Sequence, residues 1–233
     1  MRSRRPGGCG AGDPGRSGAL GPASEPAVVA SLRAAGTLVV QTVTSPAEAL
    51  LAAEAGTDVL AVQASAAGGH SGTFTPERVP APVPLTELLR RVRATVSLPL
   101  VAAGGLAGPG DVAGALRAGA ETVMAGTALL RADEAGTSLP HRAALADPGR
   151  RRTVVTRAFT GRPARALANR FTDRHSGHAP SGYPALHHLT RPMRQAAASA
   201  DEPEVIHLWA GTGYRDATAE PAARILTRLA SQV

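Results

Sequence analysis

The stretch that decides the fold is DVLAVQASAAGGHSG, residues Asp58–Gly72. It begins with the apolar run Val59–Val62 and ends in a glycine-rich loop that carries one histidine, His70. Proteins of the α/β class present their chemistry on such loops, at the carboxyl edge of a parallel sheet. Glycines let the backbone of the loop approach a ligand closely, because they lack a Cβ atom. The alternative is a loop whose histidine is only solvated.

The order of elements around this stretch predicts a parallel sheet. We expect strands at 37–43, 58–63, 99–103 and 121–125, and helices at 26–36, 45–56, 85–96 and 111–118. Alternation of this kind indicates parallel strands joined by right-handed crossovers. The predicted fold class is therefore α/β: the C-terminal half of a TIM-type β/α barrel, with about four parallel strands, followed by a C-terminal helical segment.

Two of the predicted strands end in glycine-bearing pairs, Gly104-Gly105 and Gly126-Thr127. In β/α barrels, a phosphate site is often built from the loops after the last two strands and a nearby helix N-terminus. Backbone N–H groups and a hydroxyl suit a phosphate. These pairs therefore predict a phosphate-bearing ligand at the carboxyl edge of the sheet. Alternatively, the glycines only permit tight turns between strand and helix.

The composition narrows the range of functions. Of 233 residues, 43% are hydrophobic and 3% aromatic, and all 25 basic side chains are arginine. The lack of lysine excludes Schiff-base catalysis and a Walker-type phosphate loop. Since the arginines are scattered and no aromatic stacking set accompanies them, nucleic-acid binding is not expected. No apolar run approaches the ~20 residues of a membrane span. The single cysteine, Cys9, fits a reducing interior, so we expect a cytoplasmic protein.

The chain divides into three parts. Residues 1–23 are dominated by glycine, proline and arginine and predict a disordered leader. Residues 24–149 hold the half barrel, and residues 150–233 are expected to form an extension that packs on it. The strand–helix alternation is lost in this extension, which ends in an apolar-faced helix at 219–229.

The histidines of the last third show no metal-binding pattern. Adjacent His187 and His188 point to different sides of a helix or a strand, so they are unsuited to bind one metal ion together. Trp209, the only tryptophan, is interpreted as the anchor of a packed segment. We therefore expect no metal site.

Three segments resemble the nitronate monooxygenase family, formerly called 2-nitropropane dioxygenases. They are VQASAAGGHSGTF (62–74), PLVAAGGLAGPGDVAGALRAGAETVMAGTALL (99–130) and HRAAL (141–145). An AGGH loop followed by AAGG and then by GT is more specific than any one of these motifs. The resemblance runs from about Ser24 to beyond Trp209, which is most of the chain.

The resemblance implies an FMN-dependent β/α barrel that oxidises alkyl nitronates or nitroalkanes with O2 to a carbonyl compound and nitrite. His70 matches the histidine that acts as the base of the family, and Gln63 matches a glutamine that contacts the flavin. The other positions that match the flavin site are Gly68, Gly69, Gly104, Gly105, Met124, Ala125, Gly126 and Thr127. The implied partners are a small nitro compound and O2.

The chain departs from the family pattern at several positions. Ala64 and Ala66 replace a glycine and an acidic residue of the histidine loop. Met124 and Thr212 stand where the family usually has glutamine. The first four strand–helix units of the family have no counterpart before Ser24. These departures concern the placement of flavin and substrate.

Two alternatives stay open at this point. One is a flavin-dependent enoyl-thioester (enoyl-ACP) reductase, which is similar around the same loops. The other is an inactive, truncated fragment of a nitronate monooxygenase. A half barrel leaves strand edges unpaired, so self-association through these edges is expected. It also leaves uncovered the inward strand faces, which we place at the apolar residues Val39, Leu60, Val101 and Val123.

Overall fold

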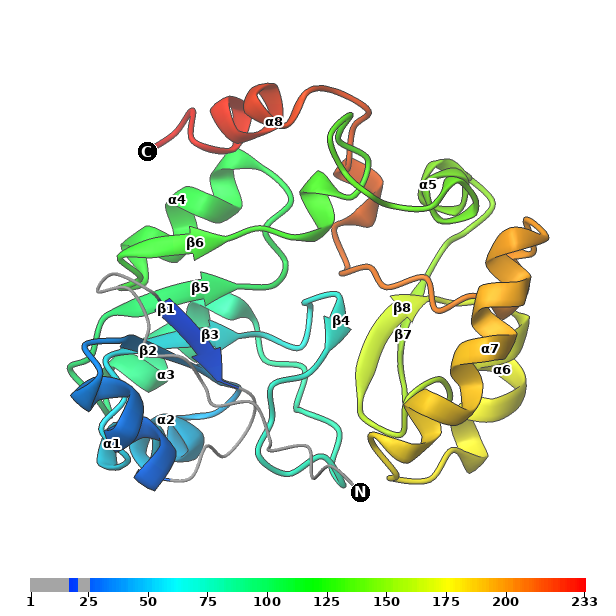
Figure 1. Cartoon of the computed structure of the whole chain (residues 1–233). Helices are drawn as coiled ribbons and strands as arrows, with labels where there is room; N and C mark the ends of the chain where they lie inside the picture. Colours follow the sequence, from blue (N-terminus) through cyan, green and yellow to red (C-terminus); the bar gives the residue numbers. More distant parts are fainter. Residues whose placement is uncertain (1–16, 21–25) are drawn as a thin grey trace, which may run out of the picture.

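A computed structural model describes residues 17–20 and 26–233, and its main layer is a five-stranded parallel sheet (Figure 1). In sheet order the strands are β1 (Ser17–Leu20), β2 (Leu38–Val43), β3 (Val59–Gln63), β5 (Leu100–Ala103) and β6 (Thr122–Met124). The helices between them are α1 (Pro26–Ala34), α2 (Pro46–Glu54), α3 (Leu85–Arg93) and α4 (Pro109–Arg117). All neighbouring strands are parallel. The predicted α/β class and the four predicted strands are confirmed.

Strand β1 was not predicted. Ser17–Leu20 lies within the leader that we expected to be disordered, but it pairs in parallel with β2, with Ser17 opposite Leu38. The exposed edge of β2 offers unpaired N–H and C=O groups, and a short extended segment satisfies them whatever its composition. The prediction is corrected for these four residues. The rest of the predicted leader lies outside the described residues.

Helices pack on one face of the sheet and form the main core. On α3, Leu88, Leu89 and Val92 are buried, as their helical spacing predicts. They join one apolar cluster with Leu60 of β3 and Leu100 of β5. Helix α2 begins as predicted, because the hydroxyl of its N-cap Ser45 accepts a hydrogen bond from the backbone N of Glu48.

The faces of the strands were assigned only in part correctly. Val39 and Leu60 are fully buried, and Leu60 lies in the helix-side cluster, so it does not point inward. Val123 also packs against that cluster. Val101 is on the opposite face, since its neighbours Leu100 and Ala102 belong to the helix side. Apolar runs without alternation do not reveal their face, and a shift of one residue exchanges the two faces.

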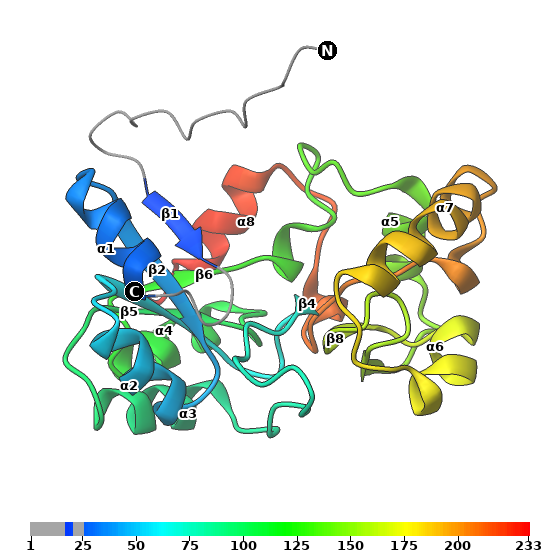
Figure 2. The ribbon, with the colours of Figure 1, turned by 60° about the horizontal axis from the view of Figure 1, so that its bottom comes forward.

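A second, antiparallel sheet lies beside the first. It has the order β4 (Gly69–His70), β8 (Ala164–Leu167) and β7 (Thr153–Thr156). Around it lie α5 (Leu139–Ala146), α6 (Arg170–His175) and α7 (Ala185–Ser199), whereas α8 (Ala222–Leu229) packs on α4 (Figures 1 and 2). Single 3-10 turns are found at Thr127–Leu129, Ser176–His178, Pro203–Val205 and Tyr214–Asp216. None of the helices described is long and apolar enough to cross a membrane.

The C-terminal part is largely helical, and it also contains an antiparallel hairpin that was not predicted. The hairpin of β7 and β8 pairs Thr153 with Leu167 and Thr156 with Ala164. Each strand has only four residues, which is too short for a clear period of two. A search for strand–helix alternation does not find an antiparallel hairpin.

The segment 206–213 connects the two sheets. Its backbone runs along β8, with Leu167 N donating to Leu208 O and Ala210 N donating to Arg165 O. Leu208 and Ala210 are fully buried. Between them, half-buried Trp209 pairs with Ala166 in an isolated bridge. The segment then passes to the carboxyl ends of the parallel strands, where it contributes to the site described below.

We expect this chain to self-associate in solution, because β6 ends the sheet on one side and Met124 is 50% exposed there. Light scattering of the eluted protein should give a mass above that of one chain. Thr122→Lys, on the exposed edge, should lower this mass, since an edge lysine disfavours strand pairing. Thr227→Lys, on the exposed face of α8, is the matched control. A monodisperse monomer with a cooperative melt would contradict this expectation.

Candidate active site

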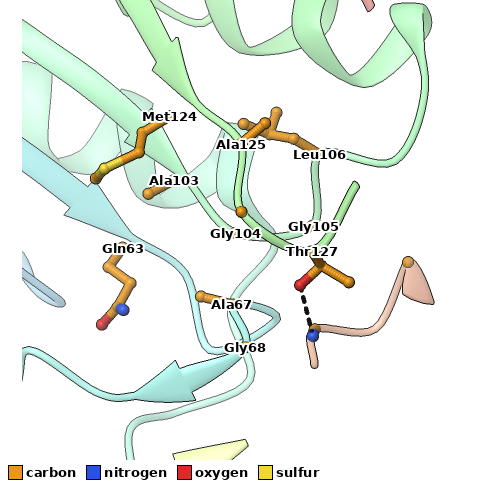
Figure 3. Close-up of a pocket in the computed structure, with 13 residues that line it drawn as sticks. Gln63, Ala67, Gly68, Ala103, Gly104, Gly105, Leu106, Met124, Ala125 and Thr127 are labelled. Atoms are coloured by element: carbon orange, nitrogen blue, oxygen red, sulfur yellow. Dashed lines mark hydrogen bonds between the residues drawn. The ribbon is translucent and has the colours of Figure 1, made fainter. Parts of the chain in front are cut away.

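A cavity of about 200 Å³ opens at the carboxyl ends of β3, β5 and β6 (Figure 3). It is lined by Gln63, Ala67, Gly68, Ala103, Gly104, Gly105, Leu106, Met124, Ala125, Gly126, Thr127, Gly211 and Gly213. The structure thus brings together all the residues predicted to hold the cofactor except Gly69. Gly69 lines a smaller adjoining pocket together with His70.

The loop after β5 presents its backbone to this cavity. Gly104 and Gly105 have φ angles of 95° and 77°, which only glycine adopts without strain. A Cβ on Gly104 would lie 2.8 Å from the backbone N of Ala67, so the two loops pack too closely for a side chain. Within the described ranges 17–20 and 26–233, the N–H groups of Gly104, Gly105 and Leu106 donate no hydrogen bond. Such a group of free donors suits an anion.

The loop after β6 adds a second set of donors. Across the part of the chain that the structure describes, the N–H groups of Gly126 and Thr127 also donate no hydrogen bond. A Cβ on Gly126 would meet no protein atom within 4 Å, so the space beside it is open to a ligand. The remaining wall is apolar, from Leu106 and Ala125. N–H donors together with apolar side chains suit an anionic ligand that also has an apolar part.

The third wall of the cavity was missed from the sequence. It is formed by Gly211 and Gly213, and Gly211 N donates to the hydroxyl of Thr127 at 2.9 Å (Figure 3). A Cβ on Gly211 would lie 2.6 Å from Ala66 O, and one on Gly68 would lie 2.6 Å from Gly211 N. The sequence feature that could have revealed this wall is the segment Trp209-Ala210-Gly211, which directly precedes Thr212.

Gln63 holds the histidine loop in place. Its Nε2 donates to His70 O at 3.1 Å, and its Oε1 accepts from Gly72 N at 2.7 Å. The side chain of Gln63 also borders both the glycine-lined cavity and the pocket of His70. A residue predicted to contact the flavin therefore also fixes the backbone of the histidine loop, at His70 and at Gly72.

Arg162 and Glu48 hold the same loop from outside. Arg162 is buried and donates from Nε to Ser71 O at 2.8 Å and from its terminal NH2 to Thr73 O at 2.6 Å. Glu48 Oε1 accepts from the Thr73 hydroxyl and from Phe74 N, both at 2.8 Å. Arg162 was assigned no role from the sequence, and Glu48 none in this loop, because these contacts span 25 or more positions along the chain.

His70 is held by its ring as well as by its backbone. Its Nε2 lies 2.9 Å from the hydroxyl of buried Thr160. Its ring packs against Trp209 and Tyr183, with centroids 5.4 and 5.7 Å away. The interpretation as a solvated loop histidine is therefore wrong. Half-buried and hydrogen-bonded, the imidazole has a defined orientation.

This environment keeps His70 neutral. Burial, and then the positive charge of Arg162, lowers the pKa of His70 to about 4. The ordinary histidine pKa of about 6.5 does not apply here. At neutral pH the imidazole is unprotonated. In the described part of the chain its Nδ1 has no hydrogen-bond partner, so that nitrogen is available to accept a proton.

The site contains no metal-binding cluster in the described ranges: no group of three or more His, Cys, Asp or Glu side chains is arranged to hold an ion. The rings of His187 and His188 lie 5.4 Å apart, and His187 also contacts Arg194. The site presents N–H donors, one neutral imidazole and a glycine-lined cavity.

The fold and this cavity define a protein of the β/α-barrel class with a glycine-lined cavity at the carboxyl ends of its strands. The family model described as nitronate monooxygenase matches residues 18–231. The chain belongs to the nitronate monooxygenase family, whose members are oxidoreductases.

Individual relatives agree with this family. A probable nitronate monooxygenase of Staphylococcus aureus (strain Newman) is 35% identical over 210 residues, which are 88% of this chain and 59% of the relative. The crystal structure of nitroalkane oxidase from Streptomyces ansochromogenes is 45% identical and superposes with a TM-score of 0.90, over 94% of this chain and 64% of that one. FabK from Thermotoga maritima has a TM-score of 0.77 at 23% identity, which shows a shared fold. The chain thus spans about three fifths of the first two relatives.

This protein should lose stability on acidification at pH values above those at which carboxylates titrate. Burial lowers the pKa of His70 and His141 to about 4 and that of His207 to about 3. Because the unfolded chain then binds more protons than the folded one, the free energy of unfolding is highest above pH ~6.5 and falls as the pH decreases toward ~4.

Urea unfolding at several pH values measures this dependence. His70→Asn should reduce the slope between pH ~6.5 and ~4.5, because one of the three titrating groups is gone. His178→Gln, at an exposed position, is the control. A free energy of unfolding that stays constant or rises on acidification over this range would contradict the burial of these histidines.

Proposed function

We propose that this protein is an FMN-dependent nitronate monooxygenase, which oxidises alkyl nitronates and nitroalkanes with O2 to a carbonyl compound and nitrite. The observation that carries the proposal is that the glycine-lined cavity and the pocket of His70 share one wall. Gln63 and Ala67 border both the glycine-lined cavity and the pocket of His70. A candidate base thus lies directly beside a cavity that suits a flavin phosphate. Membership of the nitronate monooxygenase family supports the same reaction.

The residues present fit FMN. The free N–H groups of Gly104, Gly105 and Leu106 would hold its phosphate, together with those of Gly126 and Thr127. Each donor adds a charge-assisted hydrogen bond, which is stronger than a neutral one. Apolar side chains such as Leu106 and Met124 would line the ring system. When bound, FMN would supply the two-electron oxidation and the reaction with O2.

The side chains of the protein position and deprotonate the substrate. His70 Nδ1 would take the proton from the carbon next to the nitro group, which converts a nitroalkane into a nitronate. Thr160 orients the ring through Nε2, and Arg162 holds the loop through Ser71 and Thr73. The rings of Tyr183 and Trp209 cover the imidazole and limit the access of water. A nitronate that is already deprotonated needs only the positioning.

FMN should bind much more tightly than riboflavin, because only FMN carries the phosphate. We expect at least about a tenfold difference in Kd, since one charge-assisted hydrogen bond contributes ~1.5–3 kcal/mol. Fluorescence titration of the two flavins measures it. Gly126→Ala should weaken FMN binding without loss of folding, because its Cβ meets no protein atom and instead occupies the space for the ligand.

Gly177→Ala is the matched control for this change, since its Cβ also meets open space but lies away from the cavity. Equal affinity for FMN and riboflavin would remove the phosphate site from the proposal. If bound flavin is reduced by NADPH and turns over an enoyl thioester but no nitronate, the reductase reading replaces the monooxygenase reading.

His70→Asn should lower turnover of neutral nitroalkanes by roughly 10²–10⁴-fold, the usual contribution of a general base. Turnover of preformed nitronates should fall much less, because no proton has to be removed. Steady-state oxygen consumption with both substrates measures the difference, and the flavin content of each preparation checks that the site is intact. If both substrates are handled as well as by the wild type, His70 is not the base.

A further inference from the structure

A separate cavity of about 550 Å³ lies between the start of α5, one side of α7 and the segment 206–209. Its lining includes His141, His187, Arg191, Arg194, His207 and Trp209, and it shares no residue with the glycine-lined cavity. The size is within the range of small-molecule sites. Nothing in the proposed monooxygenase reaction uses this cavity.

Arg194 gives the cavity a buried positive charge. It is 6% exposed, and within the described ranges it forms no ion pair with any carboxylate. Its Nε donates to the hydroxyl of Thr190 at 3.2 Å, and one terminal nitrogen donates to His187 O at 2.9 Å. Buried charges in proteins are normally paired, because removal from water is costly. An unpaired buried guanidinium beside a cavity points to an anion as its partner.

The contacts of Arg194 leave hydrogen-bonding capacity for such a partner. Its second terminal nitrogen lies 3.3 Å from Nδ1 and 3.4 Å from Nε2 of His207. Nearly equal distances to both ring nitrogens place it over the face of the imidazole, where no lone pair points toward it. One N–H of this nitrogen therefore points at the ring face rather than along a lone pair, which makes the contact weaker than an ordinary hydrogen bond. The other N–H group of that nitrogen remains available.

A second arginine increases the positive potential. Arg191 lies three residues before Arg194 on α7 and is exposed at the rim of the cavity. It is close enough that its positive charge, together with burial, lowers the pKa of Arg194. No aspartate or glutamate lines the cavity. Two like charges facing one space repel each other unless an anion lies between them.

Another part of the lining is apolar. It includes Ile206, Ala198 and the ring of Trp209, and the imidazoles of His141 and His207 are neutral. A dianion such as phosphate would gain nothing from contact with these apolar residues. A carboxylate carried on an apolar body matches both the arginines and the apolar residues, because the planar guanidinium pairs with the two carboxylate oxygens.

We propose that this cavity binds a small organic monocarboxylate, with its carboxylate on Arg194 and Arg191 and its apolar part against Trp209. The bound carboxylate and the candidate base would then both contact Trp209, because its indole also packs against His70, with the ring centroids 5.4 Å apart. The site is thus distinct from the flavin cavity but in contact with the ring that covers His70.

Fluorescence of Trp209, the only tryptophan of the chain, tests this site without substrate turnover. Benzoate is the probe, benzamide is its neutral counterpart, and inorganic phosphate tests for a site that accepts any anion. We expect a saturable change with benzoate, and binding at least about tenfold weaker for benzamide. Arg191→Gln should weaken benzoate binding about two- to fivefold, whereas Arg117→Gln on the exposed face of α4 should not.

Arg194→Gln should abolish binding. Because Arg194 is buried and its loss also affects folding, the test relies on Arg191→Gln, which changes only a rim residue. The proposal is overturned by any of three results: no saturable change with benzoate, equal affinities for benzoate and benzamide, or an Arg191→Gln variant that binds benzoate as well as the wild type. Phosphate binding as tight as benzoate binding would overturn the assignment to a carboxylate. None of these results depends on FMN or on nitronate oxidation.

Discussion

The amide of Gln63 is the interaction on which the candidate site depends. It lies at the end of β3 and bonds the backbone at His70 and at Gly72, so the sheet itself sets the position of the loop. An amide can do this because it offers a donor and an acceptor in one plane. A glutamate would lack the donor that His70 O requires. Arg162 and Glu48 then hold the next residues of the loop, and the imidazole has little freedom left.

Close backbone contacts join the two sheets around this loop. Gly68 and Gly211 approach so closely that a Cβ on either would lie 2.6 Å from the backbone of the other segment. The contact places segment 206–213 against the histidine loop and against Thr127. The same segment carries Trp209 to the ring of His70. Segment 206–213 thus closes the glycine-lined cavity, covers the candidate base and borders the cavity that Arg191 and Arg194 line.

Much of the parallel sheet could be predicted from the sequence, because apolar runs such as Val59–Val62 end at glycine or polar residues. The motifs also placed Gln63, Gly104 and Thr127 in one site, since the carboxyl ends of parallel strands meet at one edge. What was missed depends on contacts distant in sequence. The role of Arg162 requires the β4–β8 pairing, and the neutral state of His70 requires burial that no local pattern reveals.

The central claim is that a neutral, oriented His70 removes a proton beside the flavin cavity. The pH dependence of kcat/KM for a neutral nitroalkane tests it most directly, because kcat/KM reports the essential base of the free enzyme. With the pKa of His70 lowered to about 4, the rate should stay constant from neutral pH down to about pH 5 and fall only below it. A fall centred near pH ~6.5, the ordinary value for histidine, would contradict the account.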